Sequence, residues 1–217
     1  MPRTAGRPVP AGRVSPRAAL WFGITLAAAS FTLLSATVNV LAASLALTGF
    51  LGYVFVYTAW LKRTTPQNIV IGGAAGAVPP LVGWAAVTGT LDPTALYLFA
   101  IVFYWTPPHF WALSLLMKDE YARVGVPMMP VVRGEAETRR QILLYTVLLV
   151  VLTMIPFAFG MFGILYAVAA LGLGAAFTVL AVRLQRRADR RSALRTYLFS
   201  LGYLAALFCA MVADVQL

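Results

Sequence analysis

Seven apolar segments, each close to 20 residues long, constrain this chain more than any other feature of its sequence. They lie at about residues 17–38, 40–61, 69–88, 94–117, 141–158, 163–182 and 196–213. An α-helix needs about 20 apolar residues to cross the roughly 30 Å hydrocarbon layer of a bilayer. With 61% hydrophobic and 11% charged residues, the chain has too few charges to cover a soluble domain. We predict an all-α integral membrane protein whose seven transmembrane helices form a single polytopic domain over residues 1–217.

The positive charges lie in alternate connections between these segments. All 17 Lys and Arg residues precede or open the first segment or follow the second, fourth and sixth, and the other connections carry none. Cytoplasmic loops are enriched in Lys and Arg, so we predict a cell-membrane protein with a cytoplasmic N-terminus and an external C-terminus. Orientation and contact with anionic lipid then explain the net charge of +10, and we expect the lipid bilayer, not nucleic acid, as a partner.

The first 16 residues are basic, rich in proline and glycine, and without apolar periodicity. We predict a cytoplasmic loop there, ending in Ser15 and Pro16 as N-cap and first-turn residue of the first helix. A secretory signal peptide is the alternative, but an apolar run of about 20 residues exceeds the usual apolar core of about 7–15 residues.

The third and fourth apolar segments each contain two consecutive prolines, at 79–80 and 107–108. Proline removes a backbone donor and kinks a membrane helix, which is tolerated where neighbouring helices or a cavity satisfy the freed carbonyls. Gly72, Gly73 and Gly76 add a small face on which a helix or a bulky ligand can approach the backbone. The pattern favours an internal cavity, while close helix packing alone is an equally plausible interpretation of the glycines.

Charged residues gather where the fourth apolar segment ends. Lys118, Asp119 and Glu120 follow it directly, with Tyr121 and Arg123 behind them. Carboxylates at a membrane edge among cations suit a Mg²⁺-bridged diphosphate, because carboxylates bind the metal while cations neutralise phosphate oxygens. Adjacent carboxylates diverge by about 100° on a regular helix, so sharing a metal would require another carboxylate or an irregular loop. An ordinary solvated loop explains the residues equally well.

His109 is the single histidine of the chain and follows the second proline pair. It lies eight residues before Met117, and so roughly 12 Å below the charged surface at the rise of an α-helix. An ionisable ring at that depth is a candidate functional residue. The alternative is a neutral imidazole hydrogen-bonded to a carbonyl that the prolines free.

The chain resembles the protoheme IX farnesyltransferases, or heme O synthases, a branch of the UbiA superfamily of intramembrane prenyltransferases. The resemblance rests on TPQNIVIGGAAGAVPPLVGWAAVTG, on YWTPPHFWALSLLMKDEYARVGVPMMPVVRG and on the opening MPRTAGRPVPAGRVSP, and it covers nearly the whole chain. The motif K-D-x-Y-x-x-x-G-x-P-M of this branch is matched by Lys118, Asp119, Tyr121, Gly125, Pro127 and Met128.

This resemblance implies a nine-helix bundle, of which the seven segments correspond to the last seven helices. It implies transfer of a farnesyl group from farnesyl diphosphate to a vinyl group of heme b, giving heme O. The diphosphate would be held by Mg²⁺ at the cytoplasmic mouth, and the allylic cation would be sheltered inside the bundle, where Tyr104, Trp105, Phe110 and Trp111 are candidate cation-stabilising rings.

The resemblance also implies roles for individual residues. Asp119 would contact Mg²⁺ directly or through water, with Glu120 as a further metal contact and Tyr121 in support, and these three form the expected catalytic set. His109 would orient the heme through its iron or a propionate. The expected diphosphate contacts are Lys62, Arg63, Lys118 and Arg123, followed by Arg3 and Arg7.

Two departures from the family pattern bear on activity. The family's N-D-x-x-D-x-x-x-D motif, and the two membrane helices before it, would precede the segment that matches residues 1–16, and this chain does not contain them. In the second acidic motif, D-x-x-x-D in much of the superfamily, Arg123 follows Asp119 by four residues. We therefore interpret the chain as an N-terminally shortened form that lacks most expected metal ligands, and expect it to be inactive by itself.

Other functions remain open from the residues. Another UbiA-type prenyltransferase, a non-catalytic membrane assembly protein or a transporter would also use kinked helices around a cavity. A transporter should present polar groups on both faces, whereas the predicted external connections are nearly bare. A retinal-type receptor needs a lysine in mid-membrane, but Lys62 and Lys118 both lie at the membrane edge.

Overall fold

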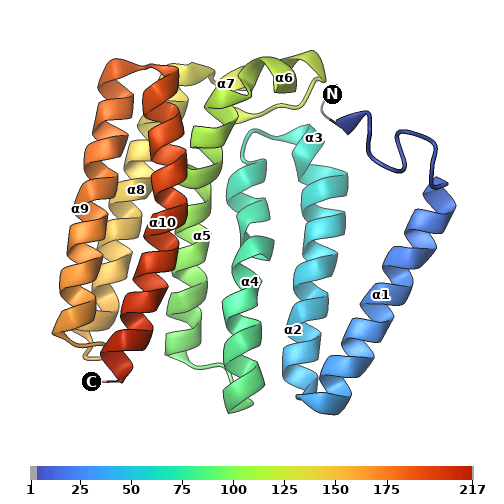
Figure 1. Cartoon of the computed structure of the whole chain (residues 1–217), viewed down its shortest axis with the longest axis horizontal. Coiled ribbons are helices and arrows are strands. Elements are labelled where there is room, and N and C mark those ends of the chain that lie inside the picture. The colour runs from blue at the N-terminus through green and yellow to red at the C-terminus, as the bar shows by residue number, and fades with distance from the viewer. Residues whose placement is uncertain (1–3, 217) are drawn as a thin grey trace.

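The computed structural model describes residues 4–216, which form a bundle of long helices running side by side (Figure 1). Short helices α3 (Lys62–Thr64), α6 (Lys118–Arg123) and α7 (Met129–Val132) lie together at one end of the bundle. The long elements are α1 (Pro16–Thr37), α2 (Val40–Leu51) continued by η2 (Gly52–Leu61), α4 (Asn68–Thr88), α5 (Pro93–Leu116), α8 (Gly134–Ala158), α9 (Ile164–Arg187) and α10 (Arg190–Val215).

Each apolar segment predicted from the sequence coincides with one long helix, the second with α2 and η2 together. The all-α fold class is therefore confirmed. By length and composition, six helices of the described part of the chain can cross a membrane, and α5 is not among them. The polar His109 and the two prolines beside it lower the mean hydropathy of α5, although its 24 residues are long enough. The chain is a multi-pass membrane protein.

The helices at the charged end continue beyond the apolar segments. α8 begins at Gly134, seven residues before the predicted start at 141, and α9 continues to Arg187. Charged side chains are compatible with helix where the helix leaves the membrane. In α8, Glu135 pairs with Arg139 at 3.4 Å and Glu137 with Arg140 at 3.7 Å, at spacings that stabilise a helical surface.

The start of α1 follows the prediction closely. The Ser15 hydroxyl accepts a hydrogen bond from the Ala18 N–H at 3.2 Å, and Pro16 occupies the first turn. The described residues before it form turns, as expected for a loop. α1 packs against α2, leans away from it toward its own N-terminal end, and has no buried residue (Figure 1).

The second long helix changes geometry half-way. Residues Gly52–Leu61 form a π-helix, whose wider turn is uncommon and is frequently found at functional sites. Apolar patterning detects a membrane helix but does not distinguish a π-helix from an α-helix, so this change of geometry could not be predicted. This segment leads directly into α3 at the charged end.

Both proline pairs lie inside continuous helices, as predicted. A proline leaves the carbonyl of the residue four positions earlier without its helical donor. In α4 those carbonyls belong to Ala75 and Gly76, and in α5 to Phe103 and Tyr104. The backbone is therefore locally short of hydrogen bonds at two neighbouring places, since α4 and α5 pack against each other.

The core consists of two clusters. The one nearer the charged end joins side chains of η2, α4, α5 and α8 to α6 and α7, with Trp111 at its centre and Met128 and Met129 anchoring the α7 segment. The other lies among α5, α8, α9 and α10 and contains Tyr166 and Tyr203. Both tyrosines are fully buried, and α5 contributes Trp111 to the first cluster and Ile101 to the second, so it packs between the two halves of the bundle.

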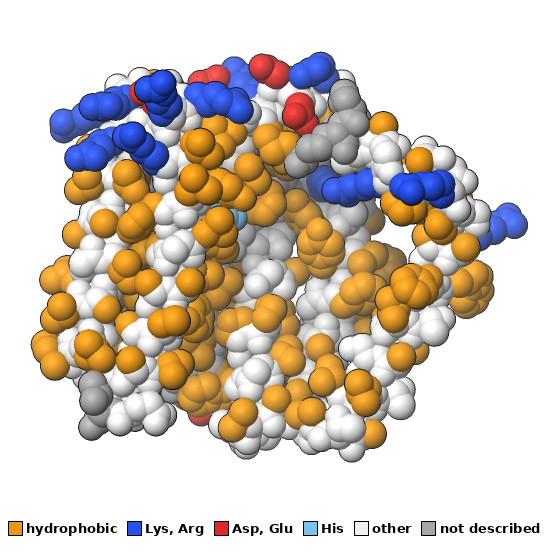
Figure 2. All heavy atoms as spheres, in the orientation of Figure 1, with side chains coloured by type: hydrophobic (Ala, Val, Ile, Leu, Met, Phe, Trp, Pro, Cys, Tyr) orange, Lys and Arg blue, Asp and Glu red, His pale blue; other side chains and the backbone are white. Residues whose placement is uncertain are grey.

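At the end of the bundle opposite α3, α6 and α7, polar side chains cap helices and connect neighbouring ones. Asn39 caps α2 and donates from Nδ2 to the Ala85 carbonyl at 2.8 Å, while Asp92 caps α5 and accepts from Trp84 Nε1 at 3.1 Å. Asp214 near the end of α10 accepts from the backbone N–H groups of Gly163 and Tyr166 at the start of α9. Lys and Arg side chains gather at the other end, around α3, α6 and the α9–α10 connection (Figure 2).

Candidate active site at the cationic end

A cavity of about 610 Å³ lies at the end of the bundle where the cations gather. We call it the rim cavity. It contains Arg7 from the N-terminal turns, Lys62 and Arg63 from α3, and Tyr121 from α6. Segments from three distant parts of the sequence meet here. The remaining lining residues are Thr4, Thr58, Val124, Gly125 and Val126.

Local backbone hydrogen bonds position the arginine of the N-terminal turns. The Arg7 N–H donates to the Thr4 carbonyl at 3.2 Å, and the Arg7 carbonyl accepts from the Ala11 N–H at 2.9 Å. Arg13 donates to the Gly6 carbonyl at 2.7 Å and closes the turn. A segment without apolar periodicity is therefore folded into a compact turn that presents Arg7 to the cavity.

The opposite wall depends on the turn after α6. Gly125 has φ of +65°, a conformation that L-residues with a side chain rarely adopt, and it ends the helix. The Val126 N–H then donates to the Tyr121 carbonyl at 3.1 Å, and Met128 and Met129 enter the core. The K-D-x-Y-x-x-x-G-x-P-M pattern thus encodes the short helix α6, a glycine with positive φ that ends it, and a buried methionine that holds the following segment in the core.

The structure brings together four of the residues predicted to act at the site. Arg7, Lys62, Arg63 and Tyr121 line the rim cavity, and Tyr121 is 8% exposed. Arg3, also predicted to contact diphosphate, lies outside the described residues. The predicted grouping of cations from the first and second charged connections is consistent with this arrangement.

Two further predicted cations bind other groups. Lys118 donates to Glu135 Oε1 at 2.9 Å, and Arg139 contacts the other oxygen of that carboxylate. Arg123 donates from Nε to the Asp119 carbonyl at 3.2 Å, folding back onto α6. Neither is among the side chains that line the rim cavity. The pairing of Lys118 with Glu135, 17 residues later, could not be foreseen because it depends on how α7 turns the chain.

The donor set for a metal ion is incomplete. Asp119 and Glu120 are adjacent on regular helix α6, Asp119 exposed and Glu120 half-buried. Within residues 4–216, three or more Asp, Glu, His or Cys side chains do not come together at any point in a way that could hold a metal. Mg²⁺ prefers several oxygen ligands in near-octahedral geometry, and two diverging carboxylates do not supply them. The described residues alone therefore do not fit a complete Mg²⁺ site.

An apolar cavity of about 150 Å³ lies between η2, α4 and α5, and we call it the inner cavity. Tyr57 of η2 lines it, while the next residue, Thr58, lines the rim cavity, and Tyr57 packs in one cluster with Tyr121. Tyrosine side chains therefore separate the two cavities. The full lining is Tyr53, Tyr57, Ile69, Gly72, Gly73, Gly76, Thr106 and Phe110.

Sequence reasoning singled out the glycines of α4 but missed the tyrosines that face them. A Cβ atom at Gly72 would lie 2.9 Å from Cγ of the Tyr57 ring, so the ring rests directly on the α4 backbone. Tyr53 and Tyr57 stack in a tilted pair with ring centroids 5.3 Å apart. Their spacing of four residues, opposite a glycine-rich helix, was the signal in the sequence.

His109 is buried between α5 and α10, stacked on Trp105 at 4.2 Å between ring centroids and near Tyr197 at 4.9 Å. Its Nδ1 lies 2.7 Å from the Ser200 hydroxyl, which itself donates to the Tyr197 carbonyl. When the single hydroxyl proton is given to the Tyr197 carbonyl, Nδ1 is the donor to Ser200 and Nε2 carries the lone pair of the neutral ring. The partner is a hydroxyl of another helix and not a carbonyl freed by the prolines.

A second, smaller charged cavity of about 200 Å³ lies where the α9–α10 connection meets α5 and α8. Arg190 donates to the Leu116 carbonyl at 3.1 Å and ties α10 to the end of α5. Asp189 caps α10, and the hydrogen bond from the Ser192 N–H lowers the pKa of its carboxyl group below the usual value. Asp189 and Arg190 line this second charged cavity together with Glu135 and Arg139, so two negative and two positive side chains balance one another. We interpret the cavity as a structural junction between the helices.

The UbiA prenyltransferase family matches residues 1–207 of this sequence. The chain belongs to this family. Family membership agrees with the expectation drawn from the motifs.

Several curated relatives named protoheme IX farnesyltransferase cover 99% of the chain. The chain is 55% identical to one from Roseiflexus sp. (strain RS-1), 54% identical to one from Trichormus variabilis and 52% identical to one from Bradyrhizobium diazoefficiens. The chain spans 40% of the length of the first, 68% of the second and 70% of the third.

The fold is also that of a solved structure from a study of digeranylgeranylglyceryl phosphate synthase in membranes. The two share a TM-score of 0.80 at 19% identity, over 99% of this chain and 76% of the other. At that identity the likeness establishes the UbiA-type helical arrangement.

Proposed function

We propose that this UbiA family chain takes part in transferring a farnesyl group from farnesyl diphosphate to a vinyl group of heme b, giving heme O. The observation that carries the proposal is the rim cavity, where three cations from two separate segments line one space next to an apolar cavity. Identity of 52–55% to protoheme IX farnesyltransferases supports the choice of farnesyl diphosphate and heme b as substrates.

Diphosphate binding would depend on Arg7, Lys62 and Arg63. Charge-assisted hydrogen bonds from guanidinium and ammonium groups to phosphate oxygens are the strong kind, and an arginine can engage two oxygens at once. The same cations would stabilise the negative charge that grows on the diphosphate as its bond to farnesyl C1 breaks. Tyr121, at the floor of the cavity, would orient the bridging oxygen.

Mg²⁺ belongs to the proposal as the expected cofactor, with Asp119 and Glu120 as its candidate contacts. Bound there, the ion would neutralise diphosphate charge. Because these two carboxylates do not complete a ligand set, the role assigned to the rim cations stands independently of the metal. Lys118 and Arg123 would act from a distance, by holding α6 in place through their contacts with Glu135 and the Asp119 carbonyl.

The inner cavity would receive the isoprenoid next to the diphosphate. Its lining is apolar, and an isoprenoid filling it would keep water from an allylic cation. The faces of Tyr53, Tyr57 and Phe110 are available to stabilise positive charge on that cation.

Heme b would be oriented by His109. A histidine that binds a metal through one ring nitrogen usually donates its other N–H to a fixed partner, and Ser200 is such a partner for Nδ1. Nε2 would then face the iron or a propionate. We further propose that the cationic end faces the cytoplasm of the cell membrane, following the distribution of Lys and Arg.

The test is direct incubation with heme b, farnesyl diphosphate and Mg²⁺, followed by mass spectrometry of the extracted heme. Two forms are compared: this chain, and a form extended upstream along its genomic reading frame. We expect heme O from the extended form. Heme O from neither form would defeat the proposed function, while prenylation of a different acceptor would indicate another UbiA-type enzyme.

A further inference from the structure

We infer that a second apolar cavity receives the distal end of the isoprenoid, and that Tyr53 and Gly76 at its entrance set the chain length this site accepts. The inference rests on the proposed function and adds a specificity determinant to it. The second cavity measures about 440 Å³ and lies between α2 and α4; we call it the interhelical cavity. Its lining is Ala46, Gly49, Phe50, Tyr53, Ala75, Gly76, Val78, Pro79 and Val82.

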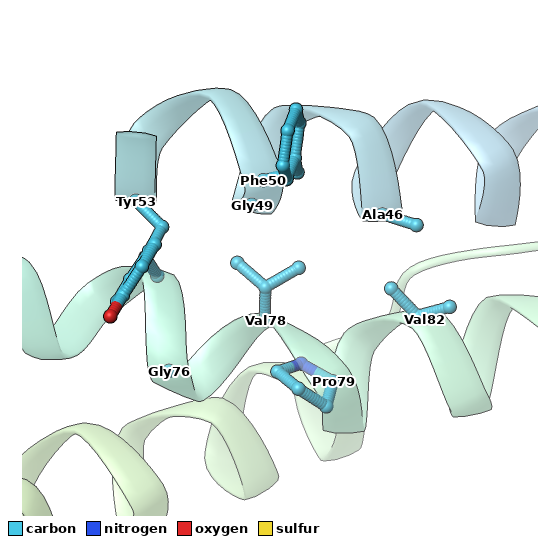
Figure 3. Close-up of a pocket in the computed structure, with 9 residues that line it drawn as sticks. Ala46, Gly49, Phe50, Tyr53, Gly76, Val78, Pro79 and Val82 are labelled. Carbon is cyan, nitrogen blue, oxygen red and sulfur yellow. The ribbon is translucent and has the colours of Figure 1, made fainter. Parts of the chain in front are cut away.

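The two apolar cavities share a boundary. Tyr53 and Gly76 line both the inner and the interhelical cavity. Figure 3 shows Tyr53 reaching from its helix toward α4 at the end where Gly76 lies, with Ala46 and Val82 at the other end. The inner and interhelical cavities are therefore neighbours, and the interhelical cavity is open at the surface of the bundle, where Phe50, Tyr53 and Gly76 are exposed.

The sequence creates this space at one place. Pro79 and Pro80 interrupt the hydrogen bonding of α4 beside the cavity, at the carbonyls of Ala75 and Gly76. Gly49 of α2 leaves room for Val78, whose side chain points toward α2, and a Cβ atom at Gly49 would lie 3.0 Å from it. Between this proline pair and the close approach of Gly49 and Val78, the small side chains of Ala46, Ala75 and Gly76 leave a gap between the two helices.

The dimensions suit a tail longer than the inner cavity can hold. Val82 lies ten residues along α4 from Gly72, or about 15 Å deeper at the rise of an α-helix. The inner cavity, with its 150 Å³, lies at the upper part of that path, and the larger cavity occupies the rest. A multi-isoprenoid chain anchored by its diphosphate at the rim must pass the Tyr53–Gly76 junction.

Gly76 is the position at which the passage can be closed without disturbing the fold. A Cβ atom there meets no atom within 4 Å, so a larger side chain would project into the open junction. Gly83, on the same helix, also has open space around an added Cβ atom but lines neither apolar cavity, and it is the matched control. Tyr53→Ala is the opposite change, because it widens the junction.

The experiment gives the heme-prenylating form equal concentrations of geranyl, farnesyl and geranylgeranyl diphosphate with heme b, and measures the ratio of prenylated hemes. We expect Gly76→Leu to lower the farnesyl-to-geranyl ratio at least tenfold and Gly83→Leu to leave it within twofold of the unchanged protein. Tyr53→Ala should raise the geranylgeranyl share. Melting temperatures in detergent confirm that each variant is folded.

The inference is overturned if Gly76→Leu keeps the original ratio, or if Gly83→Leu shifts it equally. Failure of the proposed function is a different result, in which the unchanged protein prenylates heme with none of the diphosphates. In that case the inference is still tested by binding, measured as the increase in melting temperature that farnesyl or geranyl thiodiphosphate gives. Gly76→Leu should lose the increase with the farnesyl analogue and keep it with the geranyl analogue, and equal increases contradict the inference.

Discussion

At the scale of single residues, the site depends on glycines, which have no side chain and can adopt a positive φ. The ring of Tyr57 occupies the volume that a side chain at Gly72 would need, which fixes the tyrosine between the rim and inner cavities. Gly125 performs a different task, since its positive φ ends α6 and directs the chain to its buried methionines. Two glycines thus set the position of the tyrosine between the rim and inner cavities and of one wall of the rim cavity.

Gly72→Ala should displace the Tyr57 ring and destabilise the fold by about 1–3 kcal/mol, the usual cost of overpacking. Reversible unfolding in mixed micelles measures the difference in unfolding free energy. Gly83→Ala, with free space around its Cβ atom, should instead stabilise α4 by up to about 1 kcal/mol through helix propensity. Equal stability of the two variants would show that Tyr57 does not rest on Gly72.

Lys62→Gln should raise the KM for farnesyl diphosphate about tenfold to a hundredfold, because a charge-assisted hydrogen bond contributes about 1.5–3 kcal/mol. Steady-state kinetics of heme O formation measure it. Arg187→Gln removes a positive charge from the same end, in the last turn of α9, and should leave the KM unchanged. A similar rise in both variants would mean that general surface charge, and not the rim cavity, attracts the diphosphate.

His109→Ala should abolish the Soret shift that heme b gives on binding, if Nε2 contacts the iron. Ser200→Ala keeps the imidazole but removes its orienting partner, and should weaken heme binding by a smaller factor. Absorption titration with heme b measures both. An unchanged shift in His109→Ala, together with a lowered melting temperature, would assign the histidine to packing between α5 and α10.

At the scale of elements, hydropathy predicted where long helices lie and not their ends or their geometry. Membrane length selects about 20 apolar residues, which located all seven long helices, yet α8 begins seven residues earlier because Glu135 and Arg139 support a helix in water. The π-helix from Gly52 to Leu61 was invisible, since the same residues suit either helix. Arg7, Lys62 and Arg63 lie together in the rim cavity, as their grouping at one end in the sequence suggests, but the pairing of Lys118 with Glu135 depends on α6 and α7, whose short turns leave no periodic signal.

Asp214→Ala should loosen the contact between α10 and the start of α9, because α9 has no side-chain cap of its own there. We expect a destabilisation of about 1 kcal/mol, as for loss of an N-cap, with heme O formation unchanged. Hydrogen–deuterium exchange of the peptide at residues 163–170 should become faster. Unchanged exchange in that peptide would mean that Asp214 does not hold the two helices together.

At the scale of the whole molecule, the distribution of charge and the arrangement of cavities both suit a substrate with a charged head and an apolar tail. Lys and Arg side chains gather at one end (Figure 2), and the rim cavity lies at that end. The two apolar cavities, inner and interhelical, adjoin each other through Tyr53 and Gly76. A substrate with a charged head and an apolar tail would enter such a bundle in one orientation only.

Membrane orientation can be measured with single cysteines after the native one is changed by Cys209→Ser. Thr90→Cys, in the connection between α4 and α5, should react with a membrane-impermeant maleimide on intact cells. Arg187→Cys should react only after the membrane is permeabilised. The reverse pattern would place the cationic end outside and exclude a cytoplasmic diphosphate site.

The structure of the protein with farnesyl thiodiphosphate bound, determined by cryo-electron microscopy in a lipid nanodisc, tests the account most directly. We expect diphosphate density in contact with Arg7, Lys62 and Arg63, with the isoprenoid running past Tyr57 toward Tyr53 and Gly76. Diphosphate bound at another part of the bundle, or a tail lying among α8, α9 and α10, would contradict it.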